Sequence, residues 1–159
     1  MAGNEAKDDR KCGSEILNRS GRLTLSIVCA PLVFLTITMV TDKYSYIEQP
    51  SAEVLLTAII AFPFLEEFIF RGLLHERLLS INKLATRVGV FSIASLMVAA
   101  LFAFAHVVLR EQLALVAVFI PALVIGVHYE DFDQSWMLAF VIHAWYNLVW
   151  IGSVIFVQV

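Results

Sequence analysis

Three long stretches of this chain contain no Asp, Glu, Lys or Arg, and they limit the folds available to it. They run from Leu23 to Val40, from Val88 to Leu109 and from Ser135 to Val159. An apolar run of about 18 or more residues is long enough to cross a hydrocarbon core about 30 Å thick. Two shorter apolar runs, Val54 to Leu65 and Leu113 to Val127, fit kinked, tilted or re-entrant segments. We therefore expect an all-α, polytopic membrane helix bundle with about five transmembrane helices.

Composition supports lipid as the solvent for most of the chain. The apolar content is 60% and the mean hydropathy is +0.81, both above ordinary globular usage. A soluble helical bundle needs polar stripes at helical spacing, whereas most of these stretches are apolar all round. We expect a polar tail at residues 1–22 and one membrane-embedded domain at residues 23–159. Cys12 and Cys29 cannot meet unless the tail enters lipid, so no disulfide is expected.

The distribution of charge predicts an orientation in the membrane. The net charge is −3 and the sequence contains no polybasic patch, which argues against a nucleic-acid partner. Basic residues cluster before the first apolar run and again between Arg71 and Arg87, and such clusters mark cytoplasmic loops. We therefore expect a multi-pass protein of the cell (inner) membrane with a cytoplasmic N-terminus. The loops at Thr41 to Pro50 and at Arg110 would lie outside, and His128 to Gln134 inside.

Two adjacent carboxylates end the second apolar run. Glu67 and Arg71 are four residues apart, so on a helix they share a face and the guanidinium neutralises Glu67. Glu66 projects about 100° away from that pair. A carboxyl in a site of low dielectric constant has a raised pKa, which suits a group that takes a proton from water and later returns it. The alternative is the interfacial end of a helix from which Arg71 extends outward.

Two further segments carry polar groups that are costly to bring into hydrocarbon. His106 closes the third apolar run, where it is either a functional imidazole or an interfacial one. His143 and Asn147 are four residues apart on one face of the last run, and both can donate hydrogen bonds to a developing oxyanion. They can equally serve as polar contacts between helices. Polar groups of hydrolase type on three helices of one small chain favour a common site.

The motifs Glu66-Glu67-x-x-x-Arg71, Phe102-x-x-x-His106 and His143-x-x-x-Asn147 occur in this order on hydrophobic segments. Together they resemble the signature motifs of the CAAX protease and bacteriocin-processing (Abi/CPBP) family of glutamic-type intramembrane peptidases. The resemblance implies an all-helical fold in which Glu66 and His106 activate water, and His143 and Asn147 stabilise the oxyanion. Glu67 and Arg71 would support the site, with no cofactor and no metal.

The same resemblance implies a substrate. The chain has fewer expected spans than larger members of that family, which favours a membrane-anchored peptide or protein over a prenylated protein. A leader peptide, a peptide pheromone and a C-terminal sorting segment are all of this kind. The partners expected are thus this substrate and the lipid bilayer.

Two other functions remain open at this point. The same Glu, His and Asn side chains fit a zinc metallopeptidase, although the chain has no His-Glu-x-x-His string. A non-catalytic protein, such as a bacteriocin-immunity protein, a scaffold or a small transporter, would use the buried polar groups for helix packing alone.

The remaining polar and aromatic residues are expected to be structural. We expect His75, His128 and the acidic residues between Glu130 and Asp133 to lie on a hydrated surface. Trp136, Trp145 and Trp150 are expected to anchor and pack the helices. Simple counting along the helices sets Glu66 and His106 at different depths, which requires that Gly72 to Arg87 folds back, that the third helix is longer, or that the helix kinks at Pro63.

Overall fold

The computed structural model describes residues 18–36, 51–110 and 117–157, and it confirms the all-α prediction. The first helix covers residues 18–36, so it begins inside the expected polar tail. The other elements are α2 (Ala52–Leu56), η1 (Thr57–Ala61), α3 (Phe62–Glu67), η2 (Phe68–His75), α4 (Glu76–Leu79), β1 (Arg87–Val88), β2 (Phe91–Ser92), α5 (Ile93–Arg110), α6 (Phe119–Asp131) and α7 (Trp136–Val157). The expected loop at Thr41 to Pro50 and Cys12 lie outside the described residues.

Elements α2 to α4 form one unbroken helix from Ala52 to Leu79, in which η1 and η2 are π-helical. The cytoplasmic loop that we expected to begin at Arg71 therefore begins about two turns later. Pro63 lies two residues after the end of η1, so the wider turns before it accommodate the proline and the helix continues past it. This longer helix removes the difference in depth, because Glu66 now lies near its middle.

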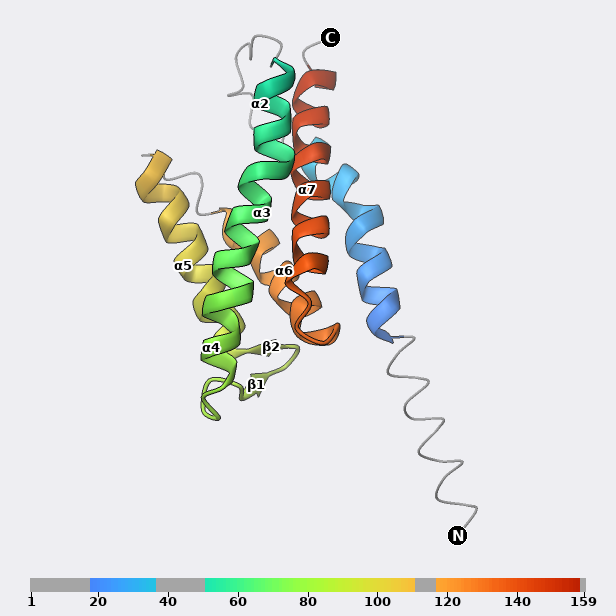
Figure 1. The fold of residues 1–159 in the computed structure, drawn as a ribbon. Coiled ribbons are helices and arrows are strands. Elements are labelled where there is room, and N and C mark those ends of the chain that lie inside the picture. The colour runs from blue at the N-terminus through green and yellow to red at the C-terminus, as the bar shows by residue number, and fades with distance from the viewer. Residues whose placement is uncertain (1–17, 37–50, 111–116, 158–159) are drawn as a thin grey trace.

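Helix α7 occupies the centre of the bundle. In Figure 1 it lies between the continuous α2–α4 helix and the helix at residues 18–36. One apolar core joins Ala30 of the first helix, Ile125 of α6, and Ile142 and Tyr146 of α7. Both faces of α7 are thus engaged, and its position depends on the two helices beside it.

Helices α5 and α6 pack closely against each other. A second apolar core lies between them and includes Ala99, Phe102 and Ala122, with Phe70 of η2 against it. Gly126 permits the close approach, because a Cβ at this position would overlap the Ser95 hydroxyl. This contact fixes the spacing of α5, which carries His106, from the rest of the bundle.

One predicted helix boundary was wrong. The third apolar run was expected to be helical from Val88, but β1 and β2 form a short antiparallel hairpin and α5 begins at Ile93. Gly89 makes the turn possible, since its φ of 67° is unfavourable for other residues. Pro121 lies in the first turn of α6, where a missing N–H is not needed.

Among the described residues, one helix, Trp136–Val157, is both long and apolar enough to cross a membrane, and Ile93–Leu109 is a shorter apolar helix. Large apolar side chains also cover the outside of the bundle. Phe104, Ile120 and Phe156 are each about two-thirds exposed, and Leu109 is 80% exposed. An apolar exterior of this kind is unusual for a soluble monomer and marks a surface that meets lipid or another apolar partner.

Candidate active site

Glu67 is the buried centre of a three-residue polar group. Its Oε1 accepts hydrogen bonds from Arg71 Nη1 at 3.1 Å and from His143 Nδ1 at 2.8 Å. Arg71 also donates from Nη2 to the carbonyl oxygen of Ala122 at 2.7 Å, which ties η2 to α6. Because the side chains of Glu67 and Arg71 are essentially inaccessible, the pair neutralises itself without water. The predicted pairing of Glu67 with Arg71 is present.

Glu66 faces the other way and lies between two imidazoles. Its Oε1 is 3.9 Å from His106 Nε2, and its Oε2 is 3.7 Å from His143 Nε2. His106 Nδ1 lies 3.0 Å from the carbonyl oxygen of Phe102, which can only accept, so Nδ1 carries a proton and Nε2 is the nitrogen that faces Glu66. Separations of this size suit groups bridged by one water molecule. Three candidate residues on three helices therefore converge on one point.

Phe102 holds the two imidazoles in place. Its buried ring lies 4.4 Å from the His106 ring and 5.8 Å from the His143 ring, measured between centroids. Arg71 Cζ sits 5.4 Å from the same centroid, at cation–π distance. The motif Phe102-x-x-x-His106 thus has a packing basis, because one aromatic ring contacts the imidazoles and the guanidinium together.

Asn147 makes a polar contact between helices, which was the alternative role considered for it from the sequence. Its Nδ2 donates to the carbonyl oxygen of Ala58 at 2.9 Å. In η1 the N–H of Phe62 bonds to the carbonyl of Thr57, so Ala58 would next pair with residue 63, which is a proline without an N–H. Asn147 therefore satisfies the carbonyl that Pro63 leaves open, and one further amide N–H remains for other contacts.

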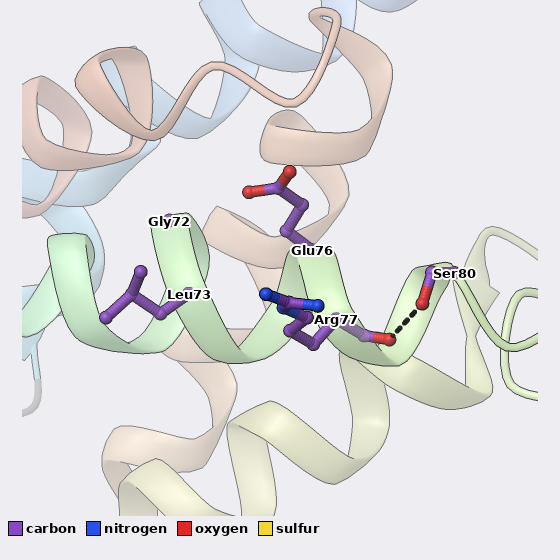
Figure 2. Close-up of a pocket in the computed structure, with 5 residues that line it drawn as sticks. All are labelled: Gly72, Leu73, Glu76, Arg77 and Ser80. Carbon is purple, nitrogen blue, oxygen red and sulfur yellow. Dashed lines mark hydrogen bonds between the residues drawn. The ribbon is translucent and has the colours of Figure 1, made fainter.

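The site is open to small molecules on one side. The side chains of Glu66 and His106 are 28% and 25% exposed, that of His143 is 10% exposed, and Glu67 is fully buried. A separate hollow of about 390 Å³ lies on the outer face of η2 and α4 and is lined by Gly72, Leu73, Glu76, Arg77 and Ser80 (Figure 2). None of the predicted site residues lines that hollow.

Metal ligation finds no ready-made cluster in the described part of the chain. No group of three or more His, Cys, Asp or Glu side chains there is arranged to hold a metal ion. The two imidazoles approach different carboxylate oxygens of Glu66.

Several residues expected on the hydrated surface are buried. His75 is fully buried, and its Nε2 lies 3.2 Å from Glu130 Oε1. His128 is also buried, with Nε2 3.0 Å from Ser26 Oγ, and Asp131 is 5% exposed. The expectation failed because these side chains find partners far away in the sequence. The spacing of Glu67, Arg71 and His75, each four residues after the last, was the available signal for a shared buried face.

Comparison with known families provides an independent line of evidence. The family model described as Rce1-like, type II CAAX prenyl endopeptidase, matches residues 48–149. The matched stretch is more than half of the chain and contains all six predicted site residues. No curated protein and no solved structure matches the chain. The helix at residues 18–36 lies outside the matched stretch.

Proposed function

Because this chain belongs to the Rce1-like family of type II CAAX prenyl endopeptidases, we propose that it hydrolyses a peptide bond of a membrane-anchored peptide or protein by glutamate-activated water. The observation that carries the proposal is the position of Glu66 between His106 and His143, at 3.9 and 3.7 Å. A water molecule in that space can contact the carboxylate and both imidazoles at hydrogen-bond distance.

In the proposed reaction the Glu66 carboxylate removes a proton from this water while the water oxygen attacks the carbonyl carbon of the scissile bond. The lone pair on His106 Nε2 accepts the second water hydrogen as a hydrogen bond and orients the molecule. The carbon–nitrogen bond then breaks, and the Glu66 carboxyl passes its proton to the leaving amine. Water is thereby divided between the new carboxyl and amine ends, and Glu66 returns to its starting state.

The oxyanion of the intermediate requires donors. His143 lies between two carboxylates, with Nδ1 bonded to Glu67 and Nε2 3.7 Å from Glu66 Oε2. In the proposed scheme the ring carries a proton on each nitrogen. The resulting imidazolium donates to the oxyanion, assisted by the remaining amide N–H of Asn147. Glu67 and Arg71 do not react in this scheme. They hold His143 in position, together with the continuous α2–α4 helix, which carries Glu66 and is called the catalytic helix below.

The membrane setting is part of the proposal. The apolar exterior of the bundle and the apolar helix α7 support a multi-pass protein with the bilayer around it. The basic residues at the N-terminal side and near Arg87 support a cytoplasmic location for that end of the bundle. A substrate with an apolar anchor would then reach Glu66 and His106 by diffusion within the plane of the membrane.

The decisive experiment replaces Glu66 by glutamine, which keeps the size of the side chain but removes the base. Membrane peptides are compared by mass spectrometry in cells that express the natural protein, Glu66→Gln, or the control Glu76→Gln, an exposed carboxylate on the same helix. We expect a cleavage product to fall by a factor of about 10² to 10⁴ in Glu66→Gln alone. An unchanged peptide set with normally folded Glu66→Gln protein would instead support a non-catalytic scaffold.

A further inference from the structure

A second buried polar cluster lies at the far end of the catalytic helix. Glu130, near the end of α6, receives three partners: His75 Nε2 lies 3.2 Å from Oε1, Ser92 Oγ donates to Oε1 at 2.5 Å, and Arg87 Nη2 donates to Oε2 at 3.2 Å. The side chain of Glu130 is 7% exposed and that of His75 is fully buried. None of these residues contacts the candidate active site.

The partners keep Glu130 charged. Burial alone would raise the pKa of Glu130, but the hydrogen bonds from His75 and Ser92 and the Arg87 guanidinium hold it below its ordinary value. A buried carboxylate with this many donors has one well-defined position. His75 is therefore held to α6 as firmly as the carboxylate itself.

His75 belongs to the same buried helix face as the residues that support the active site. Glu67, Arg71 and His75 follow one another at intervals of four, and all three are fully buried. Glu67 bonds to α7 through His143, and Arg71 bonds to α6 through the carbonyl of Ala122. The His75 contact with Glu130 is the last of these three attachments, and the His75 ring also stacks on Tyr129, 4.8 Å between centroids.

We propose that Glu130 is a positioning residue, which fixes the rotation and depth of the catalytic helix through His75 and so sets Glu66 between His106 and His143. This inference rests on the proposed peptidase function, but the geometry it concerns can be measured without turnover. A misplacement of about 1 Å at a reacting group lowers a rate by about a hundredfold. The wide π-helical turns between Glu66 and His75 leave the helix dependent on such an attachment.

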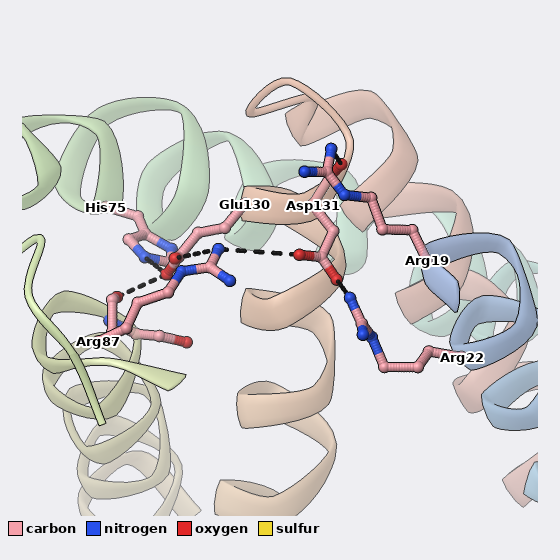
Figure 3. A network of polar contacts seen from close by, with 8 residues as sticks. Arg19, Arg22, His75, Arg87, Glu130 and Asp131 are labelled. Atoms are coloured by element: carbon pink, nitrogen blue, oxygen red, sulfur yellow. Dashed lines mark hydrogen bonds and ion pairs between the residues drawn. The ribbon is translucent and has the colours of Figure 1, made fainter. Parts of the chain in front are cut away.

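Asp131, the next residue, provides a matched control. It is buried as deeply, but it bonds to Arg22 Nη2 at 2.5 Å, and its backbone oxygen accepts from Arg19 Nη1. Figure 3 shows the division: His75 meets Glu130, whereas Arg19 and Arg22 reach Asp131 from the first helix. Arg87 is shared, since its Nη2 also lies 3.7 Å from Asp131 Oδ1, but the bond to His75 belongs to Glu130 and the bonds to the first helix belong to Asp131.

Two tryptophans report on these elements separately. Trp136 packs against the catalytic helix, 5.5 Å from Phe68 between centroids and 3.5 Å from the position of a Cβ on Gly72. Trp145 packs against the first helix and donates from Nε1 to the carbonyl oxygen of Ile27 at 3.2 Å. Incorporation of 5-fluorotryptophan gives each ring a ¹⁹F resonance, assigned by Trp136→Phe and Trp145→Phe.

The test records ¹⁹F spectra of the full chain in detergent micelles and the yield of the Glu66-dependent product in cells. Glu130→Ala should shift the Trp136 resonance and lower the product about ten- to a hundredfold. Glu130→Gln, which still accepts from His75, should restore both. Asp131→Asn should shift the Trp145 resonance and leave the yield of the product within about threefold of the yield from the natural protein.

The alternatives are distinguishable. An unmoved Trp136 resonance in folded Glu130→Ala, or an equal shift in Asp131→Asn, would overturn the positioning role. If Glu130→Ala does not fold, His75→Phe keeps the stacking on Tyr129 but cannot donate to Glu130, and the same criteria apply to it. If no Glu66-dependent product exists, the proposed function fails, while the resonance shifts still decide the role of Glu130.

Discussion

The bond from Asn147 to Ala58 makes a prediction about the proline five residues further along the helix. If Asn147 bonds to Ala58 because Pro63 cannot, then Asn147→Ala must leave a backbone carbonyl without a donor inside the bundle. Such a carbonyl costs about 1 to 3 kcal/mol of folding free energy. For a chain of this size this corresponds to a fall in Tm of about 2–4 °C per kcal/mol.

The perturbation that isolates this effect is a double-mutant cycle with Pro63→Ala. An alanine at position 63 restores an N–H that can reach the Ala58 carbonyl in the π-helical register already used by Phe62 and Thr57. The loss caused by Asn147→Ala should then be smaller by about 1 kcal/mol, the net value of one such hydrogen bond. The coupling free energy between the two positions should therefore be about 1 kcal/mol.

The assay is thermal unfolding in detergent micelles, followed by circular dichroism at 222 nm. Thr57→Val is the matched control, since the Thr57 hydroxyl bonds to the carbonyl of Glu53 and its loss should cost the same with or without Pro63. Equal destabilisation by Asn147→Ala in both backgrounds, within about 0.5 kcal/mol, would refute this account of the carbonyl.

Three further predictions concern packing, pH and metals. Gly126→Ala should lower Tm because its Cβ overlaps the Ser95 hydroxyl, and adding Ser95→Ala should recover most of the loss, as thermal unfolding would show. The pKa of Glu130 is lowered in the folded state, so its carboxylate stabilises the fold fully above the ordinary pKa of 4.5, and this stabilisation is lost as the pH falls below that value. Glu130→Gln should therefore flatten the acid side of a curve of Tm against pH. Product formation by purified protein should survive 1,10-phenanthroline and EDTA, and loss of activity that zinc restores would favour the metallopeptidase alternative.

Residue spacing was sufficient for pairings within one helix. Glu67 and Arg71 pair as their four-residue interval predicts, and the order of the three motifs led to a site in which Glu66, His106 and His143 meet. These inferences succeed because helical geometry converts a sequence interval directly into a shared face.

The sequence pattern did not predict where the helices end or which of the charged and histidine side chains are buried. Charged residues after Arg71 looked like a hydrated loop, yet the helix continues to Leu79 because His75 has a buried partner 55 positions away. Such a partner is invisible to local periodicity, which also explains why His128 was expected in water. The short hairpin before α5 was missed because residues 88–91, which form its turn and half of each strand, carry no charge and extend the apolar run of the helix that follows.

Glu66 and Glu67 are identical residues joined by one peptide bond, and they occupy different media. Glu66 is partly exposed, so protons and dissolved reagents can reach it, whereas Glu67 is sealed between a guanidinium and an imidazole. One carboxylate is therefore accessible from outside the bundle, as the proposed reaction requires, while its neighbour is enclosed by its two partners. A rotation of about 100° around one helix axis is enough to place two identical side chains in different surroundings.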